Sequence, residues 1–218
     1  MKRSLSFFRQ MFALLCLMLF LNPADAGNAD KVIKSIQNTY RNAKNLELEF
    51  RQVNRFKFTG TENSVSGRLM LSGEDRFRFD ADDQVLVSNG EILWRFNKIE
   101  NQVLIDRFRE EEKEDFFNSF LYNVQDHYYG DILAEEKSEG KKIYEIKLTP
   151  KPEQQSPFAA IRIWVTDKTW EIRKVIYVRF NGDETEYAIE KLNFDPRFDE
   201  ADFSFTPPAD TRVIDLRM

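Results

Sequence analysis

Residues 85–97 read VLVSNGEILWRFN, and this stretch decides the fold class. Two short apolar runs flank Asn89-Gly90, and Asn-Gly between such runs is a strong signal for a β-hairpin. A type I′ turn is expected there, because both of its central residues need a positive φ and Asn-Gly tolerates that. Asn181-Gly182 stands in the same way between 171–180 and 184–194, which predicts a second hairpin near the C-terminus.

Apolar and polar residues alternate along most of the remaining chain, as they do in strands with one buried face. Leu46, Leu48 and Phe50 alternate with charged residues. The same period of two recurs at Phe56 and Phe58, Leu69 and Leu71, Phe77 and Phe79, Tyr144 to Leu148, and Ile161 to Val165. Roughly ten or eleven strands at short spacing predict an antiparallel sheet or partial barrel, in one domain over 27–218.

Two segments have helical spacing instead. The first is an amphipathic helix of about four turns, with Asn28 as its N-cap and Asp30 in its first turn. Its apolar positions are Val32, Ile33, Ile36, Tyr40 and Ala43. The second is expected over 112–124, after an acidic start. Its apolar face consists of Phe116, Phe117, Phe120, Leu121 and Val124. Such an aromatic face either packs on the sheet as ordinary core or closes a cavity.

The first 26 residues have the layout of a secretory signal peptide. Basic residues precede an uncharged apolar run over 11–21, and Ala24-Asp25-Ala26 provides the cleavage pattern, so that Gly27 becomes the N-terminus. An uncleaved anchor is the alternative, but the run is shorter than the ~20 residues that span a bilayer. A lipoprotein signal at Cys16 is disfavoured, because Leu15 stands where a small residue is needed. After cleavage, 29 basic and 36 acidic residues remain, with a net charge of −7 and no cysteine.

Composition argues against several functions. The whole chain has a net charge of −5 and a pI near 5.2, whereas nucleic-acid-binding domains carry a basic surface. One His and one Cys leave little for metal or triad chemistry, and no Walker A, GxSxG, HExxH or GxGxxG motif occurs. His127 is expected to be structural or exposed rather than a catalytic base. A carboxylate pair for glycoside hydrolysis stays open as an alternative. The 20 Phe residues suit an apolar ligand such as acyl chains, or an ordinary core.

Four motifs together resemble the periplasmic outer-membrane lipoprotein carrier proteins, the LolA family. They keep the family's order over about 30–215. They are Phe50-Arg51-Gln52 in the first strand, the hairpin over 87–97, Leu148-Thr149-Pro150-Lys151 at a strand end, and Phe203-Ser204-Phe205-Thr206-Pro207-Pro208 with Val213-Ile214-Asp215 after it.

The resemblance implies a mostly β, α+β fold: an incomplete antiparallel barrel whose open side is covered by helices. It also implies a monomer without enzymatic activity, cofactor or metal. Such a protein takes lipoproteins from an inner-membrane ABC transporter to an outer-membrane receptor through the periplasm of a Gram-negative bacterium. The acyl chains are expected on a cavity and lid formed by Phe50, Leu69, Leu71, Phe77, Phe79, Val87, Trp94, Phe96, Phe116, Phe117, Phe120 and Leu121. For Trp94, packing as plain core beneath the helix is an open alternative.

One position departs from the family. Members carry Arg-Pro where this chain has Gly73-Glu74, and that Arg latches the lid to the sheet. Arg76 could replace the latch, whereas Arg78 should point outward by alternation. Gly73 could instead occupy a turn with positive φ, where any side chain is unfavourable. A second functional hypothesis is a sensor of lipid or mislocalised lipoprotein on the same half-barrel. Such relatives carry a second domain, and a lipid-anchored receptor would need a lipobox.

Overall fold

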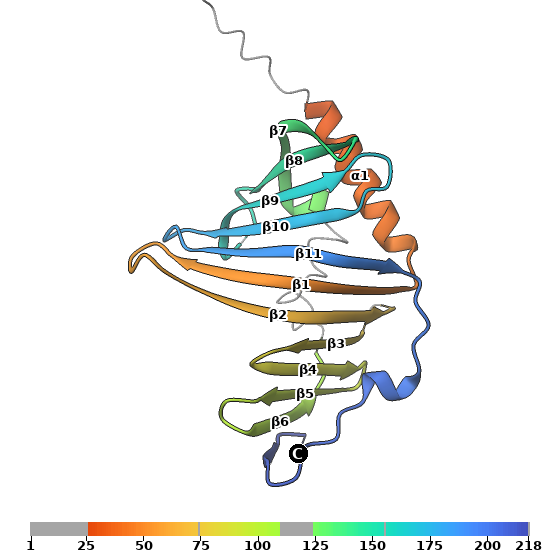
Figure 1. The fold of residues 1–218 in the computed structure, drawn as a ribbon, viewed down its shortest axis with the longest axis vertical. Coiled ribbons are helices and arrows are strands. Elements are labelled where there is room, and N and C mark those ends of the chain that lie inside the picture. The colour runs from red at the N-terminus through yellow and green to blue at the C-terminus, as the bar shows by residue number, and fades with distance from the viewer. Residues whose placement is uncertain (1–25, 74, 110–123, 155, 218) are drawn as a thin grey trace, which may run out of the picture.

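The computed structural model describes residues 26–73, 75–109, 124–154 and 156–217. In these residues, twelve strands form one unclosed sheet in the order β12-β6-β5-β4-β3-β2-β1-β11-β10-β9-β8-β7 (Figure 1). The strands are β1 (Asn45–Phe56), β2 (Thr61–Ser72), β3 (Arg76–Ala81), β4 (Gln84–Asn89), β5 (Ile92–Asn97), β6 (Gln102–Arg107), β7 (Tyr128–Ser138), β8 (Lys141–Pro150), β9 (Phe158–Thr166), β10 (Ile172–Arg179), β11 (Glu184–Phe194) and β12 (Arg212–Asp215).

The expected incomplete antiparallel barrel is therefore confirmed, with one addition at its edge. The short strand β12 pairs in parallel with β6, while the other neighbours in the sheet are antiparallel. Phe58 was expected to continue the first strand, but β1 ends at Phe56 and Phe58 lies in the following turn. No helix in the described part of the chain is long and apolar enough to cross a membrane.

Both Asn-Gly hairpins are confirmed, but the expected type I′ turn is wrong in each. Gly90 and Gly182 have positive φ values of 94° and 85°, whereas Asn89 and Asn181 are not among the residues with positive φ. The Asn side chains explain the difference. The Asn89 Oδ1 accepts hydrogen bonds from the amides of Glu91 and Ile92 at 2.9 and 2.8 Å. The Asn181 Oδ1 accepts one from the Asp183 amide at 3.0 Å. An Asx turn of this kind needs no left-handed Asn.

The helix α1 (Ala26–Asn42) begins before the expected N-cap. Asn28 lies inside the helix and its first turn contains no acidic residue, so the predicted cap and the placement of Asp30 are wrong. Ala has the highest helix propensity of all residues, which favours extension of the helix to Ala26. Residues 1–25, with most of the expected signal peptide, lie outside the described residues, and cleavage after Ala26 stays a prediction.

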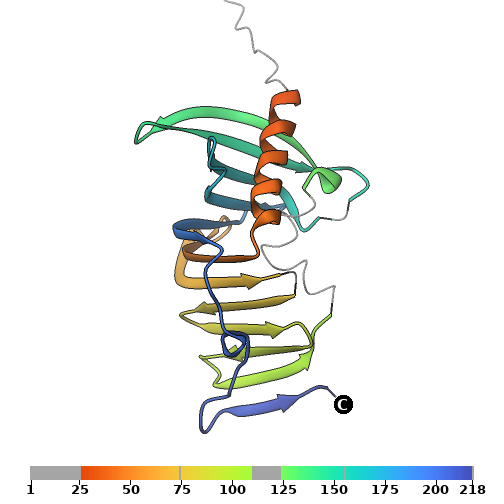
Figure 2. The ribbon, with the colours of Figure 1, turned by 90° about the vertical axis from the view of Figure 1, so that its right-hand side faces the viewer.

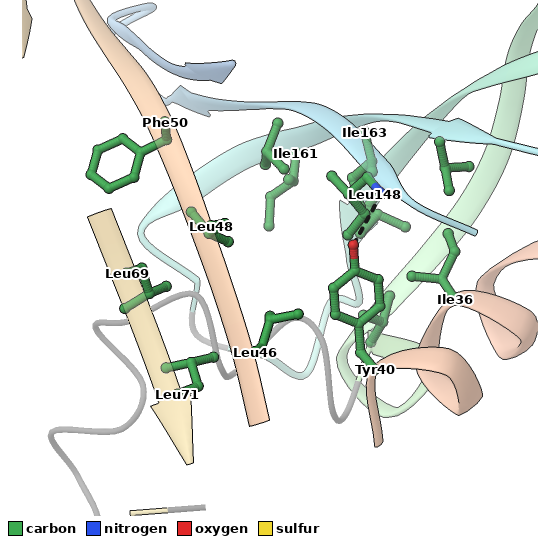
Figure 3. Packing of buried hydrophobic residues seen from close by; sticks show 14 of the residues in the cluster. Ile36, Tyr40, Leu46, Leu48, Phe50, Leu69, Leu71, Leu148, Ile161 and Ile163 are labelled. Carbon is green, nitrogen blue, oxygen red and sulfur yellow. Dashed lines mark hydrogen bonds between the residues drawn. The ribbon is translucent and has the colours of Figure 1, made fainter. Parts of the chain in front are cut away.

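The apolar side of α1 packs on one face of the sheet, called the inner face below. Val32, Ile33, Ile36 and Tyr40 are each at most 4% exposed. The Ile172 amide donates a hydrogen bond to the Tyr40 Oη at 3.0 Å (Figure 3). A Cβ built at Gly130 would lie 2.2 Å from the Ile33 Cδ1, so the missing side chain of Gly130 lets α1 approach β7 closely.

The C-terminal segment, residues 195–211, covers the opposite, outer face. It includes the short helix η2 (Glu200–Phe203) and runs beside β3 to β6 (Figures 1 and 2). Phe203 is 2% exposed, and the Arg76 guanidinium carbon lies 5.6 Å from the centre of its ring. The rings of Phe205 and Phe96 are 5.6 Å apart. α1 and the C-terminal segment therefore cover opposite faces of the two halves of the sheet.

Candidate functional site

Five aromatic rings form a continuous row across the inner face, from β3 through β1, β11 and β10 to β9. The Phe50 ring stacks on Phe79 at 5.2 Å and meets Tyr187 edge-on at 5.6 Å. The ring centres of Tyr187 and Tyr177 are 6.0 Å apart, and those of Tyr177 and Phe158 are 4.8 Å apart. We call Phe79, Phe50, Tyr187, Tyr177 and Phe158 the aromatic row.

The position of β1 in the sheet explains why Phe50 joins the two halves of this row. β1 pairs with β2 on one side and with β11 on the other, and Phe50 stands opposite Gly67 and Ile189. A Cβ at Gly67 would lie 2.6 Å from the Phe50 Cζ and 2.8 Å from the Asp80 carbonyl oxygen. Only glycine therefore lets the Phe50 ring lie directly over β2.

The chemistry of the inner face changes along β1 towards its hairpin tip. Leu46, Leu48 and Phe50 are buried, and their alternation along β1 places them on one face. The next residues on this face are Gln52 and Asn54, which form what we call the amide ladder. The Gln52 Nε2 donates to the Asn54 Oδ1 at 3.1 Å, and the same oxygen accepts from the Thr185 Oγ1 at 2.9 Å. The Asn54 Nδ2 donates to the Asn63 Oδ1 at 2.9 Å. The aromatic row therefore ends at a hydrogen-bonded polar boundary.

The aromatic row is uncharged at neutral pH. Burial raises the pKa of Tyr187 to about 12 and that of Tyr177 well above its ordinary value, so both stay as phenols. The positive charge of Arg179 lowers the pKa of Tyr187 by less than burial raises it. The Arg179 guanidinium carbon lies 5.6 Å from the centre of the Phe158 ring, at one end of the row. Rings without charge form a suitable surface for an apolar ligand.

Five residues predicted from the sequence lie together on the inner face. Leu69 pairs with Phe79 and Leu71 pairs with Phe77, and directly paired residues share a face. Phe50 joins them through β2, and the exposed fractions of these five side chains are 1–6%. Phe77 also meets Phe108 edge-on at 6.0 Å.

Three other predicted residues lie on the outer face. Phe77 pairs with Ser88, and Ser88 pairs with Leu93, so these share the inner face. Val87 and Trp94, which pair with each other, and Phe96 have the opposite orientation by alternation. The contact of Phe96 with Phe205 agrees with this placement. The remaining predicted residues, Phe116, Phe117, Phe120 and Leu121, lie outside the described residues.

Sequence reasoning missed the residues of the aromatic row that come from the C-terminal half. Tyr177 alternates with the buried Val175, and Tyr187 with Ile189. The period of two was therefore visible there, but periodicity alone does not say that these strands lie next to β1.

The expected latch residues take other roles. Gly73 has a φ of 65°, and its amide donates to the Lys44 carbonyl oxygen at 3.0 Å, so the interpretation as a turn is confirmed. The Arg76 Nη2 donates to the Ser72 Oγ at 3.0 Å, and the Arg78 Nη1 donates to the Ser204 carbonyl oxygen at 3.5 Å. Both arginines therefore lie on the outer face, where they meet the C-terminal segment, as alternation predicted for Arg78.

The groups that the sequence analysis considered for catalysis or metal binding can be placed in the described residues. They contain no group of three or more His, Cys, Asp or Glu residues placed to hold a metal ion. The His127 Nδ1 lies 2.8 Å from the Gln154 Oε1, which agrees with a structural role. A cavity of about 630 Å³ lies beside Phe108 at the ends of β5, β6 and β12. There Asp215 forms an ion pair with Arg217, whose hydrogen bonds lower the pKa of Asp215 to about 2.

Three solved structures are similar to this chain, and the first of them supports the fold. An uncharacterized conserved protein from Thermus thermophilus superposes with a TM-score of 0.56 at 10% identity, over 86% of this chain and 99% of its own. A domain of a Vibrio parahaemolyticus protein described as an outer-membrane lipoprotein-sorting protein gives a TM-score of 0.45 at 12% identity, over 82% and 97%. The Pseudomonas aeruginosa MucA/MucB complex gives a TM-score of 0.38 at 12% identity, over 86% of this chain and 63% of the matched chain.

No curated protein sequence matches this chain. The family model described as outer membrane lipoprotein carrier protein LolA matches residues 41–206, which contain all five rings of the aromatic row. This match covers most of the chain, and it agrees with the unclosed sheet and with the motifs of the sequence. The chain therefore belongs to the LolA family.

Proposed function

We propose that this protein is a periplasmic carrier that binds the acyl chains of lipoproteins on the inner face of its sheet. The aromatic row is the observation that supports this most directly. Its rings come from five strands and form an uncharged surface. An apolar surface of this kind suits a member of a family of lipoprotein carriers. Phe77, Leu69 and Leu71 extend the same surface over β2 and β3.

The proposed cargo face consists of two sets of residues. The first set contains the inner-face residues expected from the sequence, Phe50, Leu69, Leu71, Phe77 and Phe79. The second adds Tyr177, Tyr187 and Phe158 from the aromatic row. Val87, Trp94 and Phe96 are left out because the register places them on the other face. The segment with Phe116, Phe117, Phe120 and Leu121 is proposed as the lid, as the family resemblance implies.

The energetics of acyl transfer indicate which partners are needed. Burial of an acyl chain stabilises it by about 0.8 kcal/mol for each CH₂ group. Two or three long chains therefore amount to tens of kcal/mol relative to water, which a passive carrier cannot supply. We propose that an inner-membrane ABC transporter loads this protein and that an outer-membrane receptor accepts its cargo. No cofactor and no catalytic residue is part of this proposal.

Site-specific photocrosslinking tests the cargo face. A photoreactive phenylalanine analogue is placed at Phe79 or Tyr187 on the inner face, and at Trp94 or Phe96 as matched outer-face controls. Each variant is co-expressed with a lipoprotein and purified from the periplasm. Crosslinks from the inner pair and none from the outer pair are expected. Folded variants that crosslink equally from both faces, or from neither, contradict the proposed face.

Transfer between membranes tests the carrier role separately. Protein that is loaded with a lipoprotein should deliver it to vesicles that contain the receptor. Mass spectrometry of whatever co-purifies with the native protein identifies the cargo. Stable binding without transfer would contradict a carrier role and favour lipoprotein sensing.

A further inference from the structure

Two adjacent hairpins project phenylalanine side chains into solvent at one side of the sheet. Phe58, between β1 and β2, is 100% exposed, and Phe56 beside it is 40% exposed. Phe180, between β10 and β11, is 75% exposed. Figure 1 shows both hairpins ending side by side, at the ends of the strands on the side away from α1. We call residues 56–60 together with 180–182 the paired tip.

The paired tip is held together as one unit. The Lys57 amide donates a hydrogen bond to the Asp183 Oδ1 at 2.9 Å, which joins the two hairpins directly. A Cβ at Gly182 would lie 2.4 Å from the Lys57 Cδ, so the lysine side chain lies against the second turn. Phe58 and Phe180 are therefore presented on the same part of the surface.

Three backbone amides of the paired tip are hydrogen-bonded within the two hairpins. The Gly60 amide donates to the Phe56 carbonyl oxygen at 2.8 Å, and the Gly182 amide donates to the Arg179 carbonyl oxygen at 2.9 Å. An unpaired amide costs several kcal/mol in an apolar environment, which limits what most loops can insert into a bilayer. The amides of Lys57, Gly60 and Gly182 are already bonded within the two hairpins.

We propose that the paired tip contacts the interfacial layer of a lipid bilayer, with Phe58 and Phe180 inserted among the lipids. An aromatic side chain buries about 150–250 Å², so the exposed parts of the three rings offer roughly 300–500 Å². A specific protein partner usually needs about 800 Å² on each side. A lipid surface needs no complementary shape, and a projecting apolar tip inserts into it more readily than into a groove.

The charges near the tip favour apolar over electrostatic attachment. Arg55 forms ion pairs with Glu186 at 2.9 Å and with Glu62 at 3.7 Å, so its charge is largely compensated. Lys57 and Asp183 contribute opposite charges. Binding should therefore persist at about 1 M salt, where the screening length is about 3 Å. The amide ladder separates this surface from the aromatic row, so the tip is distinct from the proposed cargo face.

Vesicle flotation with the purified protein tests the proposal, using vesicles of phosphatidylethanolamine and phosphatidylglycerol without any lipoprotein. Phe58→Ser combined with Phe180→Ser should lower the vesicle partition coefficient by roughly tenfold or more. Ile99→Ser is the matched control, because Ile99 is 82% exposed at a different hairpin turn. It should leave partitioning unchanged. All three side chains are exposed, so folding should be preserved.

A depth measurement gives a second, independent readout. Brominated lipids should quench the fluorescence of the tryptophan introduced by Phe58→Trp. They should not quench that of the tryptophan introduced by Ile99→Trp. Equal flotation of the wild-type protein and the double variant, or equal quenching at the two positions, overturns the proposal. A dimer that dissociates in the double variant while flotation is unchanged overturns it as well, in favour of contact between copies. Because no lipoprotein is present, these outcomes are independent of the proposed carrier function.

Discussion

The β7–β11 half and the β2–β6 half of the sheet share β1 as a neighbour, but the described segments that cover them lie on opposite faces. α1 covers the inner face of the first half, where Ile146, Leu148 and Val165 have exposed fractions of 0%. The C-terminal segment covers the outer face of the second half through Phe203 and Phe205. In the second half the inner-face residues Leu69, Leu71 and Phe77 are buried as well.

The two covering segments separate at a single junction. α1 leads into β1, and the C-terminal segment leaves β11, which pairs with β1. Asp195 has a φ of 54° and turns the chain away from the sheet. Its Oδ1 accepts hydrogen bonds from the amides of Lys44 and Asn45 at 2.7 and 3.3 Å. This local turn therefore sends the two segments to different faces.

The two covering segments contact different strands of the sheet. The contacts of α1 are with β7, β10 and β11, and those of the C-terminal segment are on the outer side of β3 to β5. Phe77 and Phe79 lie on the inner face of β3, where both are buried. Stability in this half therefore depends partly on the outer cover, and its aromatic inner face is where we propose that the acyl chains bind.

The largest effect is expected in the half that α1 covers. Leu148 has an exposed fraction of 0% and lies beside Gly130 beneath the helix. Leu148→Ala should lower the free energy of unfolding by about 2–5 kcal/mol, because it removes buried methyl groups and leaves a cavity. Urea denaturation measures the change, with Leu133→Ala as the control because Leu133 is 51% exposed. A loss below about 1 kcal/mol would mean that this region does not act as the rigid core.

Two glycine substitutions sharpen the comparison between the halves. Gly67→Ala should lower the free energy of unfolding by about 1–3 kcal/mol, because the new methyl group meets the Phe50 ring and the Asp80 carbonyl oxygen. Gly130→Ala should cost less, because its close contact is the Ile33 Cδ1, the end of a side chain that can rotate. Thermal unfolding of both variants gives the order. Equal costs would show that the Phe50 ring shifts as easily as the Ile33 side chain.

A pH titration examines the aromatic row that connects the halves. Burial raises the pKa of Tyr187 from 10.0 to about 12, so the native state holds this proton more tightly than the unfolded state. The corresponding stability is complete below pH 10 and is lost as pH rises towards 12. At pH 11, Tyr187 should account for about 1.4 kcal/mol of the loss. Tyr187→Phe should remove this part of the alkaline decline, as measured by urea denaturation at several pH values. An unchanged decline would place Tyr187 in a more solvated environment.

The sequence predicted the strands better than their arrangement. Leu46, Leu48 and Phe50 lie on one face as their alternation indicated. Alternation fixes the relative faces of residues within one strand, but the register with neighbouring strands decides which face is inner. This is why Trp94 was grouped with Phe77, although they lie on opposite faces.

The aromatic row was hidden for a related reason. Phe50 and Tyr187 meet only because β1 pairs with β11, across more than half of the chain. No local pattern contains that information. The predicted turn type was wrong for a different reason. The Asn89 side chain forms hydrogen bonds that propensities for turn types do not include.

The most local effect is expected at Gly73, in the turn between β2 and β3. Its φ of 65° is unfavourable for residues with a Cβ, so Gly73→Ala should cost about 1–2 kcal/mol. Gly73→Asn should cost less, because Asn adopts the left-handed region more readily. A Cβ at this position meets nothing within 4 Å, so the cost comes from the backbone alone. Gly73→Arg should therefore cost as much as Gly73→Ala, and the arginine that relatives use as a latch should not be restored. Hydrogen exchange over 112–124 distinguishes the two outcomes: unchanged exchange agrees with this expectation, whereas slower exchange in Gly73→Arg alone would show that the latch had formed.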